Sequence, residues 1–377
     1  MMSNKELLPD GSERLLRMAY TPSAVHGVTV LVVISCFSLV AVVGLLIAIS
    51  VSAFNTRASP DKYLFVRTHV AAYFLSLLLS DLIQAIGSIL NVKWIRDLAV
   101  VVDDTCTVQG VLKQTADVAT ALWSLVIAIH TFCILFLDLK PNRVALLATL
   151  IAGWSGIAAI VTIGPAGMDT TRHGPFFGIS GYWCWIAEEY PTSRITLDYL
   201  FMFIAAAFSF VLYSLIFFRL RGNIIVHNWH ISFRRAGVSM GTSAWRGQGR
   251  ENRTLTIAKK MLLCVVAYTI MILPIAASRF SSFAGQEVPF GVTIFADSVF
   301  LLSGVINVAM FTMIRRILPA DSFKIPKWII SRPRPSAELA VELRQDSYYQ
   351  SPDAALYDER KKHVFLTRVV EVSGPES

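Results

Sequence analysis

Charged and amide side chains interrupt a long apolar segment in the first half of the sequence. Gln109, Lys113 and Asp117 follow one another at four-residue spacing, which places them on one face of a helix. Lys113 lies about 10 Å beyond Cys106 along a helix that rises about 1.5 Å per residue. Because charged groups inside a membrane are costly and usually functional, we expect Lys113 and Asp117 to line a ligand pocket, where the cation suits an anionic or hydroxyl-rich ligand. The alternative is that the two residues neutralise each other as a structural pair.

Polar residues in other apolar segments are candidates for the same pocket. Gln84, Ser88 and Asn91 share one face of an earlier segment, and Arg279 and Asp297 lie in the outer parts of two later ones. If all these segments are helices of one bundle, their polar faces can meet at a common depth. We therefore expect these five residues to bind the ligand in a polar cavity that opens outward.

The segment 165–194 is unusually aromatic for a connecting loop. Its aromatic residues are Phe176, Phe177, Tyr182, Trp183, Trp185 and Tyr190. Glycines among them permit tight turns. We expect a folded lid over the pocket, in which Trp183 and Trp185 contact the ligand. The alternative is that the aromatic rings anchor the loop at the headgroup level of a membrane.

The chain has five cysteines, too few for a disulfide scaffold. Cys106 begins an apolar segment and Cys184 lies in the aromatic loop. Both face an oxidising compartment in the topology that the loop charges predict, so we expect a bridge between them, which would draw the loop over the bundle centre. The alternative is that all five are free. Cys36, Cys133 and Cys264 lie within apolar segments and are expected to act as small apolar packing residues.

A second group of residues lies deeper in the apolar segments. Asp81 is near the middle of one, Asn307 is in the inner half of the last, and Pro274 interrupts another. A carboxylate in the middle of a membrane needs a partner, an ion or a proton, and an internal proline kinks a helix. We expect these three residues to form a switch. The alternative for Asp81 is a buried, protonated acid.

Long apolar helices must position these residues. Hydrophobic residues make up 54% of the chain and charged residues 16%, against about 25% charged residues in soluble domains. A spanning helix needs about 20 mostly apolar residues. Seven segments meet this requirement, over residues 25–54, 68–92, 105–137, 144–163, 195–218, 257–280 and 290–314. The sequence therefore predicts an all-α membrane protein, a seven-transmembrane helix bundle.

Lysine and arginine are distributed unequally between the loops on the two sides of this bundle. With the N-terminus outside, the inner loops contain 20 of these residues and the outer loops eight. By the positive-inside rule this places the N-terminus outside and the C-terminus inside. We expect an extracellular tail over 1–24, a transmembrane domain over 25–316, and a cytoplasmic, mostly disordered tail over 317–377.

The predicted inner loops are strongly basic around the fifth and sixth spans. The basic residues concerned are Arg219, Arg221, Arg234, Arg235, Lys259 and Lys260. Together with the apolar residues between them, they suit an acidic or amphipathic cytosolic partner. The alternative is that they only set the topology and contact membrane lipids. A net charge of +8 would suit a nucleic-acid partner in a soluble protein. Here the excess of lysine and arginine in the predicted inner loops accounts for this charge, so we expect no nucleic-acid partner.

Three short stretches form a pattern that is typical of a known receptor family. They are Ser80-Asp-Leu-Ile-Gln84, Cys106-Thr-Val-Gln-Gly110, and Gly181-Tyr-Trp-Cys-Trp-Ile186 followed by Tyr190, Arg194 and Asp198-Tyr199. The pattern resembles the cyclic-AMP-receptor-like family of G-protein-coupled receptors, which includes slime-mould cyclic AMP receptors and fungal glucose-sensing receptors. The resemblance implies a plasma-membrane receptor, not an enzyme and without a cofactor. It would sense an extracellular nutrient, sugar or cyclic nucleotide and activate a heterotrimeric G protein upstream of cyclic AMP.

Departures from the rhodopsin-like receptors limit what can be carried over. The third span ends in Leu137-Asp-Leu-Lys140 rather than Asp-Arg-Tyr, and the seventh has Asn307-Val308 rather than Asn-Pro. The ionic-lock residues of those receptors therefore have no counterpart here.

Other classes of seven-span protein fit the sequence less well. A retinal protein needs a lysine in the seventh span, and none occurs between Lys260 and Lys324. A zinc hydrolase needs clustered ligands, whereas only His69 and His130 lie well inside spans, so we expect no metal. The alternative that remains is a multi-pass transporter of a small polar solute, which would favour paired broken helices in corresponding halves.

Overall fold

The computed structural model describes residues 4–7, 11, 13–55, 68–137, 139, 141–167, 174–220, 224–227, 230–233, 270–271, 273–278, 280–281, 285–286 and 288–314. The chain divides into two compact units, Met1–Ser322 and Phe323–Ser377. The second unit and the whole expected tail over 317–377 lie outside the described residues.

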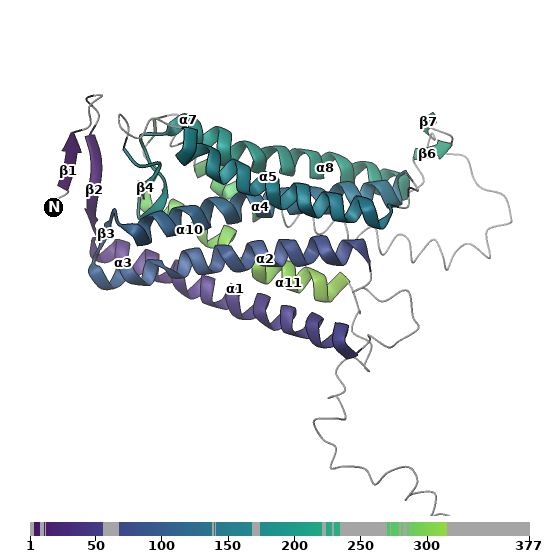
Figure 1. The fold of residues 1–377 in the computed structure, drawn as a ribbon, viewed down its shortest axis with the longest axis horizontal. Coiled ribbons are helices and arrows are strands. Elements are labelled where there is room, and N and C mark those ends of the chain that lie inside the picture. The colour runs from purple at the N-terminus through teal and green to yellow at the C-terminus, as the bar shows by residue number, and fades with distance from the viewer. Residues whose placement is uncertain are drawn as a thin grey trace, which may run out of the picture. The chain divides into compact units, whose positions relative to one another are not determined.

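Helices account for most of the described chain (Figure 1). They are α1 (Pro22–Asn55), α2 (His69–Ile89), α3 (Asn91–Asp97), α4 (Asp104–Leu135), α5 (Arg143–Gly167), α7 (Pro191–Arg194), the π-helical turn η2 (Ile195–Tyr199), α8 (Leu200–Leu220), α10 (Phe290–Leu301) and α11 (Ser303–Ile314). The turn η2 continues directly into α8, so α7, η2 and α8 form one helical rod.

Six helical stretches of the described residues are long and apolar enough to cross a membrane. They are Pro22–Asn55, His69–Asp97, Asp104–Leu135, Arg143–Gly167, Pro191–Arg219 and Phe290–Thr312. These coincide with six of the seven expected spans. The seventh expected stretch, 257–280, is described only in part, at residues 270–271, 273–278 and 280, which are helical. The count of seven and the orientation therefore stay predictions.

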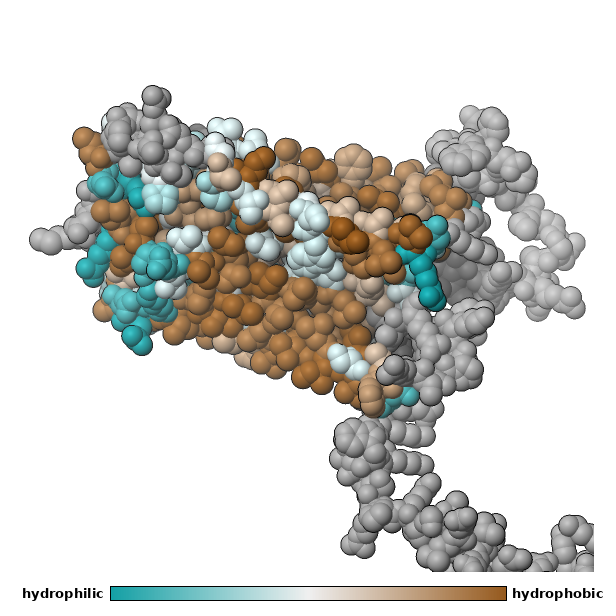
Figure 2. All heavy atoms as spheres, in the orientation of Figure 1, coloured by the Kyte–Doolittle hydropathy of each residue, from teal (hydrophilic) through white to brown (hydrophobic). Residues whose placement is uncertain are grey.

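The outward faces of the helices are apolar. Figure 2 shows a broad hydrophobic surface along the bundle, with most hydrophilic residues gathered near one end and a few near the other. Val40, Val144 and Ile151 are 71%, 72% and 65% exposed. The buried face of α1 instead contains Ser35 and Ser38, and small residues of this kind let helices approach closely in lipid. An exposed apolar surface of this extent suits hydrocarbon tails rather than water, as in a multi-pass membrane protein.

Helix α4 is the central element. It packs against α2, α8 and α5, and at its first turns against the hairpin of β4 (Phe177–Ser180) and β5 (Trp183–Ile186). Gln109, Gln114 and Trp123 of this helix are fully buried. Of the polar face that the sequence indicates, Gln109 is thus fully buried, and Lys113 and Asp117 are half-buried.

Short strands modify the all-α expectation. Strands β1 (Asn4–Leu7), β2 (Glu13–Ala19) and β3 (Ala99–Val101) form one sheet, β4 and β5 a second, and β6 (Ile224–His227) and β7 (His230–Phe233) a third. Part of the expected N-terminal tail is thus a strand, and Arg17 pairs opposite Val101. Figure 1 shows β1–β5 at one end of the bundle, which we name the hairpin end, and β6 and β7 at the opposite end.

Candidate functional site

The expected disulfide is present at the hairpin end. Cys106, in the first turn of α4, is bonded to Cys184 of β5, with the two Cα atoms 5.1 Å apart. Both cysteines are completely buried. Cys36 and Cys133 are free thiols, as expected, and Cys264 lies outside the described residues. The aromatic loop is therefore covalently attached to the central helix.

The β4–β5 hairpin lies directly against α4. Ser180 and Trp183 pair across a two-residue turn, in which Gly181 has a φ of +66°, a conformation that favours glycine. Phe177 packs on Gly110 of α4, where an added Cβ would lie 2.7 Å from the phenyl ring. A larger residue at position 110 would push the hairpin away from the helix.

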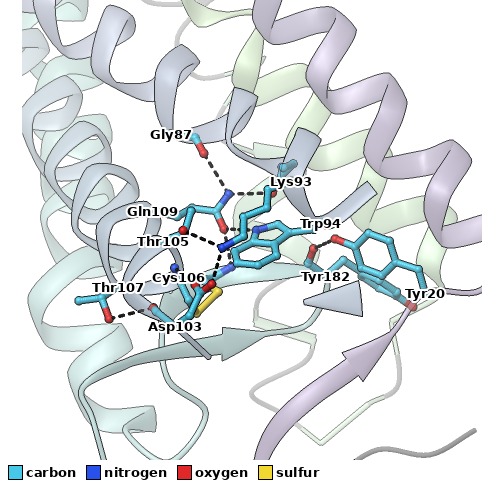
Figure 3. Close-up of a disulfide and its surroundings, with 12 residues drawn as sticks. Tyr20, Gly87, Lys93, Trp94, Asp103, Thr105, Cys106, Thr107, Gln109 and Tyr182 are labelled. Atoms are coloured by element: carbon cyan, nitrogen blue, oxygen red, sulfur yellow. Dashed lines mark hydrogen bonds and ion pairs between the residues drawn. A yellow bond between two sulfur atoms is a disulfide. The ribbon is translucent and has the colours of Figure 1, made fainter. Parts of the chain in front are cut away.

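The side chain of Gln109 joins four elements around the bridge (Figure 3). Its Oε1 accepts hydrogen bonds from Trp94 Nε1 and from the backbone N–H of Cys184, each at 2.9 Å. Its Nε2 donates to Gly87 O at 3.0 Å and to Asn91 Oδ1 at 2.7 Å. The amide group thus uses both donors and both acceptor positions. Gln109 holds α2, α3 and β5 to α4 and is a positioning residue for the hairpin.

The start of α4 is fixed by Asp103 (Figure 3). Its Oδ1 accepts from the backbone N–H of Cys106 at 2.9 Å, and its Oδ2 is ion-paired with Lys93, which also donates to Thr105 Oγ1 at 2.8 Å. Partial burial opposes ionisation of Asp103, but the hydrogen bonds from Lys93 and Cys106 outweigh it and hold the pKa of this carboxyl below its ordinary value. The helix cap and the ion pair together position Cys106.

We expect Asp103→Ala to lower the free energy of unfolding by about 1 kcal/mol, the usual cost of losing an N-cap, and Asp103→Asn to lower it by less. Because the folded pKa lies below the unfolded value of about 3.9, the carboxylate stabilises the protein fully above that pH, and this contribution is lost as the pH falls through the folded pKa. Thermal unfolding of the two variants at about pH 7 and about pH 3 measures the effect. A wild-type advantage over Asp103→Asn that is equal at both pH values would contradict the role of the charge.

A cavity lies beneath the hairpin, between the helices. The space among its lining residues, its open side included, is about 510 Å³. The cavity is lined by Gln84, Lys113, Asp117, Trp183, Trp185, Tyr199, Met202, Ile275, Asp297, Phe300 and Leu301. The structure thus brings together six of the nine residues predicted to bind a ligand, from α2, α4, β5 and α10.

The other three predicted ligand residues do not line this cavity. Ser88 and Asn91 are completely buried, and Asn91 accepts the hydrogen bond from Gln109. Arg279 lies outside the described residues. The apolar lining residues Tyr199 and Met202 were not predicted, because an apolar side chain in an apolar span gives no sign of which way it faces.

The two tryptophans of β5 form the roof of the cavity. Lys113 Nζ lies over the Trp183 ring, 4.5 Å from its centroid, and the Arg194 guanidinium lies 5.4 Å from the centroid of Trp185. Both tryptophans are almost fully buried, at 3% and 4% exposure. This placement supports the lid interpretation over anchoring at the headgroup level, because the rings face the protein interior.

Arg194 fastens the hairpin to the next helix. Its Nη2 donates to Ile186 O at 2.8 Å and its Nε to the same oxygen at 3.0 Å. Trp185 in turn packs edge-on against Tyr199, with the ring centroids 5.3 Å apart. The hairpin, Arg194 and Tyr199 of η2 are therefore joined to one another at the cavity.

A hydrogen-bonded group leads from the cavity toward the opposite end. The hydroxyl of Ser303 lies 2.9 Å from Gln84 Oε1 and 3.0 Å from Asp81 Oδ1, and Asn307 Nδ2 donates to Asp81 Oδ2 at 2.7 Å. Since a hydroxyl has one proton, Ser303 donates to one of its two acceptors at a time. Two predicted switch residues, Asp81 and Asn307, are thus joined, and Ser303 links them to the cavity residue Gln84. The third, Pro274, directly precedes the lining residue Ile275 in the sequence.

One of the predicted basic partner residues is described. Arg219, at the end of α8, donates from Nη1 to Leu135 O at 3.0 Å and lies over the Phe136 ring. It therefore ties α8 to α4 at the opposite end of the bundle. The other five, Arg221, Arg234, Arg235, Lys259 and Lys260, lie outside the described residues.

Comparison of the sequence with models of known protein families and with curated proteins finds no match. The class of protein is therefore defined here by fold and site alone. The described chain has six helices of membrane-spanning length and composition. It also has a cavity under a disulfide-tied hairpin.

Proposed function

We propose that this chain is a seven-span receptor of the plasma membrane that binds an extracellular small molecule and activates a heterotrimeric G protein, upstream of cyclic AMP. In this proposal the N-terminus and the hairpin end face outward. The excess of lysine and arginine in the alternate loops supports this orientation. A disulfide at the hairpin end also fits an oxidising exterior.

One observation carries the proposal: the cavity is connected by hydrogen bonds to the interior of the bundle. Gln84 lines the cavity and is 2.9 Å from the Ser303 hydroxyl, which also reaches Asp81. All three side chains are at most 5% exposed. A ligand that moves Gln84 would change which of the two acceptors receives the hydrogen bond from Ser303. The contacts of Asp81 with Asn307 would then change as well. Such a group has the two alternative arrangements that an allosteric switch requires.

The packing beyond Asp81 favours a receptor over a transporter. Val42, Leu78 and Phe311 form a buried apolar cluster toward the opposite end, and the rings of Phe74 and Phe311 stack with centroids 4.6 Å apart. This cluster fills the space between α1, α2 and α11 and leaves no polar path among these three helices. A signal can cross this cluster by movement of the helices, whereas a polar solute could pass between these three helices only by breaking the cluster.

The G protein is proposed to bind at the opposite end. Arg219 lies there, where α8 meets the end of α4. The basic residues that follow it in the sequence suit an amphipathic helix with acidic residues. Anionic lipid is also a partner for this face.

The test is a ligand screen in cells that express the full chain together with defined Gα subunits. Sugars, cyclic nucleotides, amino acids and amines are applied, and dissociation of the G protein is recorded beside uptake of each labelled compound. The proposal expects dissociation without accumulation of solute. Accumulation that needs no Gα subunit would instead establish the transporter alternative.

A further inference from the structure

The turn of the β4–β5 hairpin is held by two aromatic residues from other parts of the chain. Tyr182 lies in this turn, and its ring is edge-on to the ring of Phe290, the first residue of α10, with the centroids 4.5 Å apart. The Tyr20 hydroxyl donates to Tyr182 O at 2.5 Å, and the two tyrosine ring centroids are 6.4 Å apart. Figure 3 shows Tyr20 and Tyr182 beside each other, joined by this hydrogen bond. We name Tyr20, Tyr182 and Phe290 the latch.

The latch is anchored in the N-terminal sheet and in the first helix. Tyr20 directly follows β2, and its backbone N–H donates to Leu98 O at 2.8 Å. Phe290 packs on Gly27 of α1, where an added Cβ would lie 2.5 Å from the phenyl ring. Burial raises the pKa of the Tyr20 hydroxyl above its ordinary value, so this group stays protonated and remains a hydrogen-bond donor. Two anchored side chains thus hold the turn in place.

The rest of β5 is fixed by different contacts. Cys184 is bonded to α4 through the disulfide, and Arg194 donates two hydrogen bonds to Ile186 O. Trp185 lies between these two fixed points, whereas Trp183 lies between the disulfide and the turn. A movement of the turn would therefore carry Trp183 with it and leave Trp185 in place.

Trp183 separates the cavity from the hairpin end. It lines the cavity, is 3% exposed, and its ring centroid is 4.5 Å from Lys113 Nζ. A ligand that arrives from the hairpin end therefore has to displace this ring. Because Trp183 directly follows Tyr182 in the chain, the displacement requires Tyr182 to move away from its two partners in the latch.

We infer that the hairpin turn is the gate of the cavity and that the latch keeps this gate closed. Release of Tyr182 from Tyr20 and Phe290 lets the turn swing about the disulfide and carries Trp183 off the cavity. A local opening of this kind needs less free energy than unfolding of the whole protein, and lids commonly control access to ligand sites. This inference rests on the proposed ligand site and adds the route by which the ligand enters it.

The rate at which a small reagent reaches the cavity tests the gate. Met202 lines the cavity and is 3% exposed, so Met202→Cys places a thiol inside it. The purified full chain with this substitution is treated with iodoacetamide in lipid nanodiscs. Mass spectrometry follows alkylation at position 202 separately from the native cysteines. If the gate closes faster than the thiol reacts, the alkylation rate is proportional to the population of the open form.

Tyr20→Phe, made together with Met202→Cys, keeps the ring and removes the hydroxyl of the latch. We expect alkylation at position 202 to become about twofold to tenfold faster, the effect of one lost hydrogen bond on the opening equilibrium. Phe290→Leu removes the other ring that holds Tyr182 and is expected to act in the same direction. Tyr190→Phe is the matched control, because the Tyr190 hydroxyl also donates to a backbone oxygen of this loop, Gly174 O at 2.5 Å, outside the latch. This control should leave the alkylation rate unchanged.

The inference is overturned if neither Tyr20→Phe nor Phe290→Leu speeds alkylation at position 202, because the reagent then enters by another route. It is also overturned if Tyr190→Phe speeds alkylation equally. The same holds if alkylation of the native, half-buried Cys133 rises by the same factor, since the whole bundle would then be loosened. The assay contains no ligand and no G protein. A gate that opens as expected in a chain that activates no G protein would refute the receptor proposal alone, whereas ligand-driven activation with unchanged alkylation would refute the gate alone.

Discussion

Gln109→Ala is expected to lower the free energy of unfolding by about 4 kcal/mol, since it breaks four buried hydrogen bonds and leaves polar groups unsatisfied. The Trp94 Nε1 and the backbone N–H of Cys184 each lose their acceptor. The contacts that still hold the hairpin to α4 include the disulfide, apolar packing and the Lys113 ammonium group over the Trp183 ring. Thermal or denaturant unfolding of the purified chain in detergent measures the loss.

Gln114→Ala is the matched control for this prediction. Gln114 is on the same helix and is equally buried, but its Nε2 makes one long hydrogen bond, to Leu197 O at 3.3 Å. Gln114→Ala removes the same atoms as Gln109→Ala. It is expected to lower the free energy of unfolding by about half as much or less. Equal losses of unfolding free energy at positions 109 and 114 would show that the volume of the removed side-chain atoms, rather than the hydrogen bonds of Gln109, sets the stability of this region.

Breaking the Cys106–Cys184 disulfide is expected to have the second large effect on stability. Cys106→Ser and Cys184→Ser each remove the only covalent link between the hairpin and α4, at a cost of about 2–5 kcal/mol. We expect surface expression to fall strongly in either variant. The double variant should be no worse than the more severe single one, because the first substitution already opens the bridge.

Cys133→Ser controls for the loss of a thiol, because Cys133 is a free, half-buried cysteine of α4. It is expected to leave expression close to that of the wild type. Surface expression and thermal stability are measured for all four proteins. Defects that add in the double variant would mean that Cys106 and Cys184 act separately.

The spans could be predicted because a membrane helix needs a long apolar stretch and little else. The stretch expected over 25–54 is the helix Pro22–Asn55. Because lipid and the protein interior are equally apolar, a uniformly apolar sequence does not indicate which side of each helix is buried. Strand β2 was not predicted, because its sequence lacks the alternation and β-branched residues of a strand. It forms by pairing with β3, a tertiary contact.

The candidate site was predictable where its residues contrast with their surroundings. Lys113, Asp117 and Asp297 stand out because charges are rare in apolar spans. Asn91 was misplaced for a physical reason: α2 ends at Ile89 and the chain enters α3, so helical spacing across that break no longer describes one face. Ser303 was missed because a serine in a membrane helix is common, and only its two partners distinguish it.

The central claim is that the cavity is coupled to G-protein binding through Ser303. The most direct measurement is the affinity of the activating ligand with and without nucleotide-free G protein, in the wild type and in Ser303→Ala. The ratio of the two affinities measures the coupling, which is typically about 5–150-fold. We expect Ser303→Ala to reduce this shift from its wild-type value to a ratio of nearly one. Ligand affinity without G protein should change only a fewfold. Ser35→Ala, in which the lost hydroxyl bonds within its own helix, should keep the full shift. A Ser303→Ala protein that retains the wild-type shift would contradict the account.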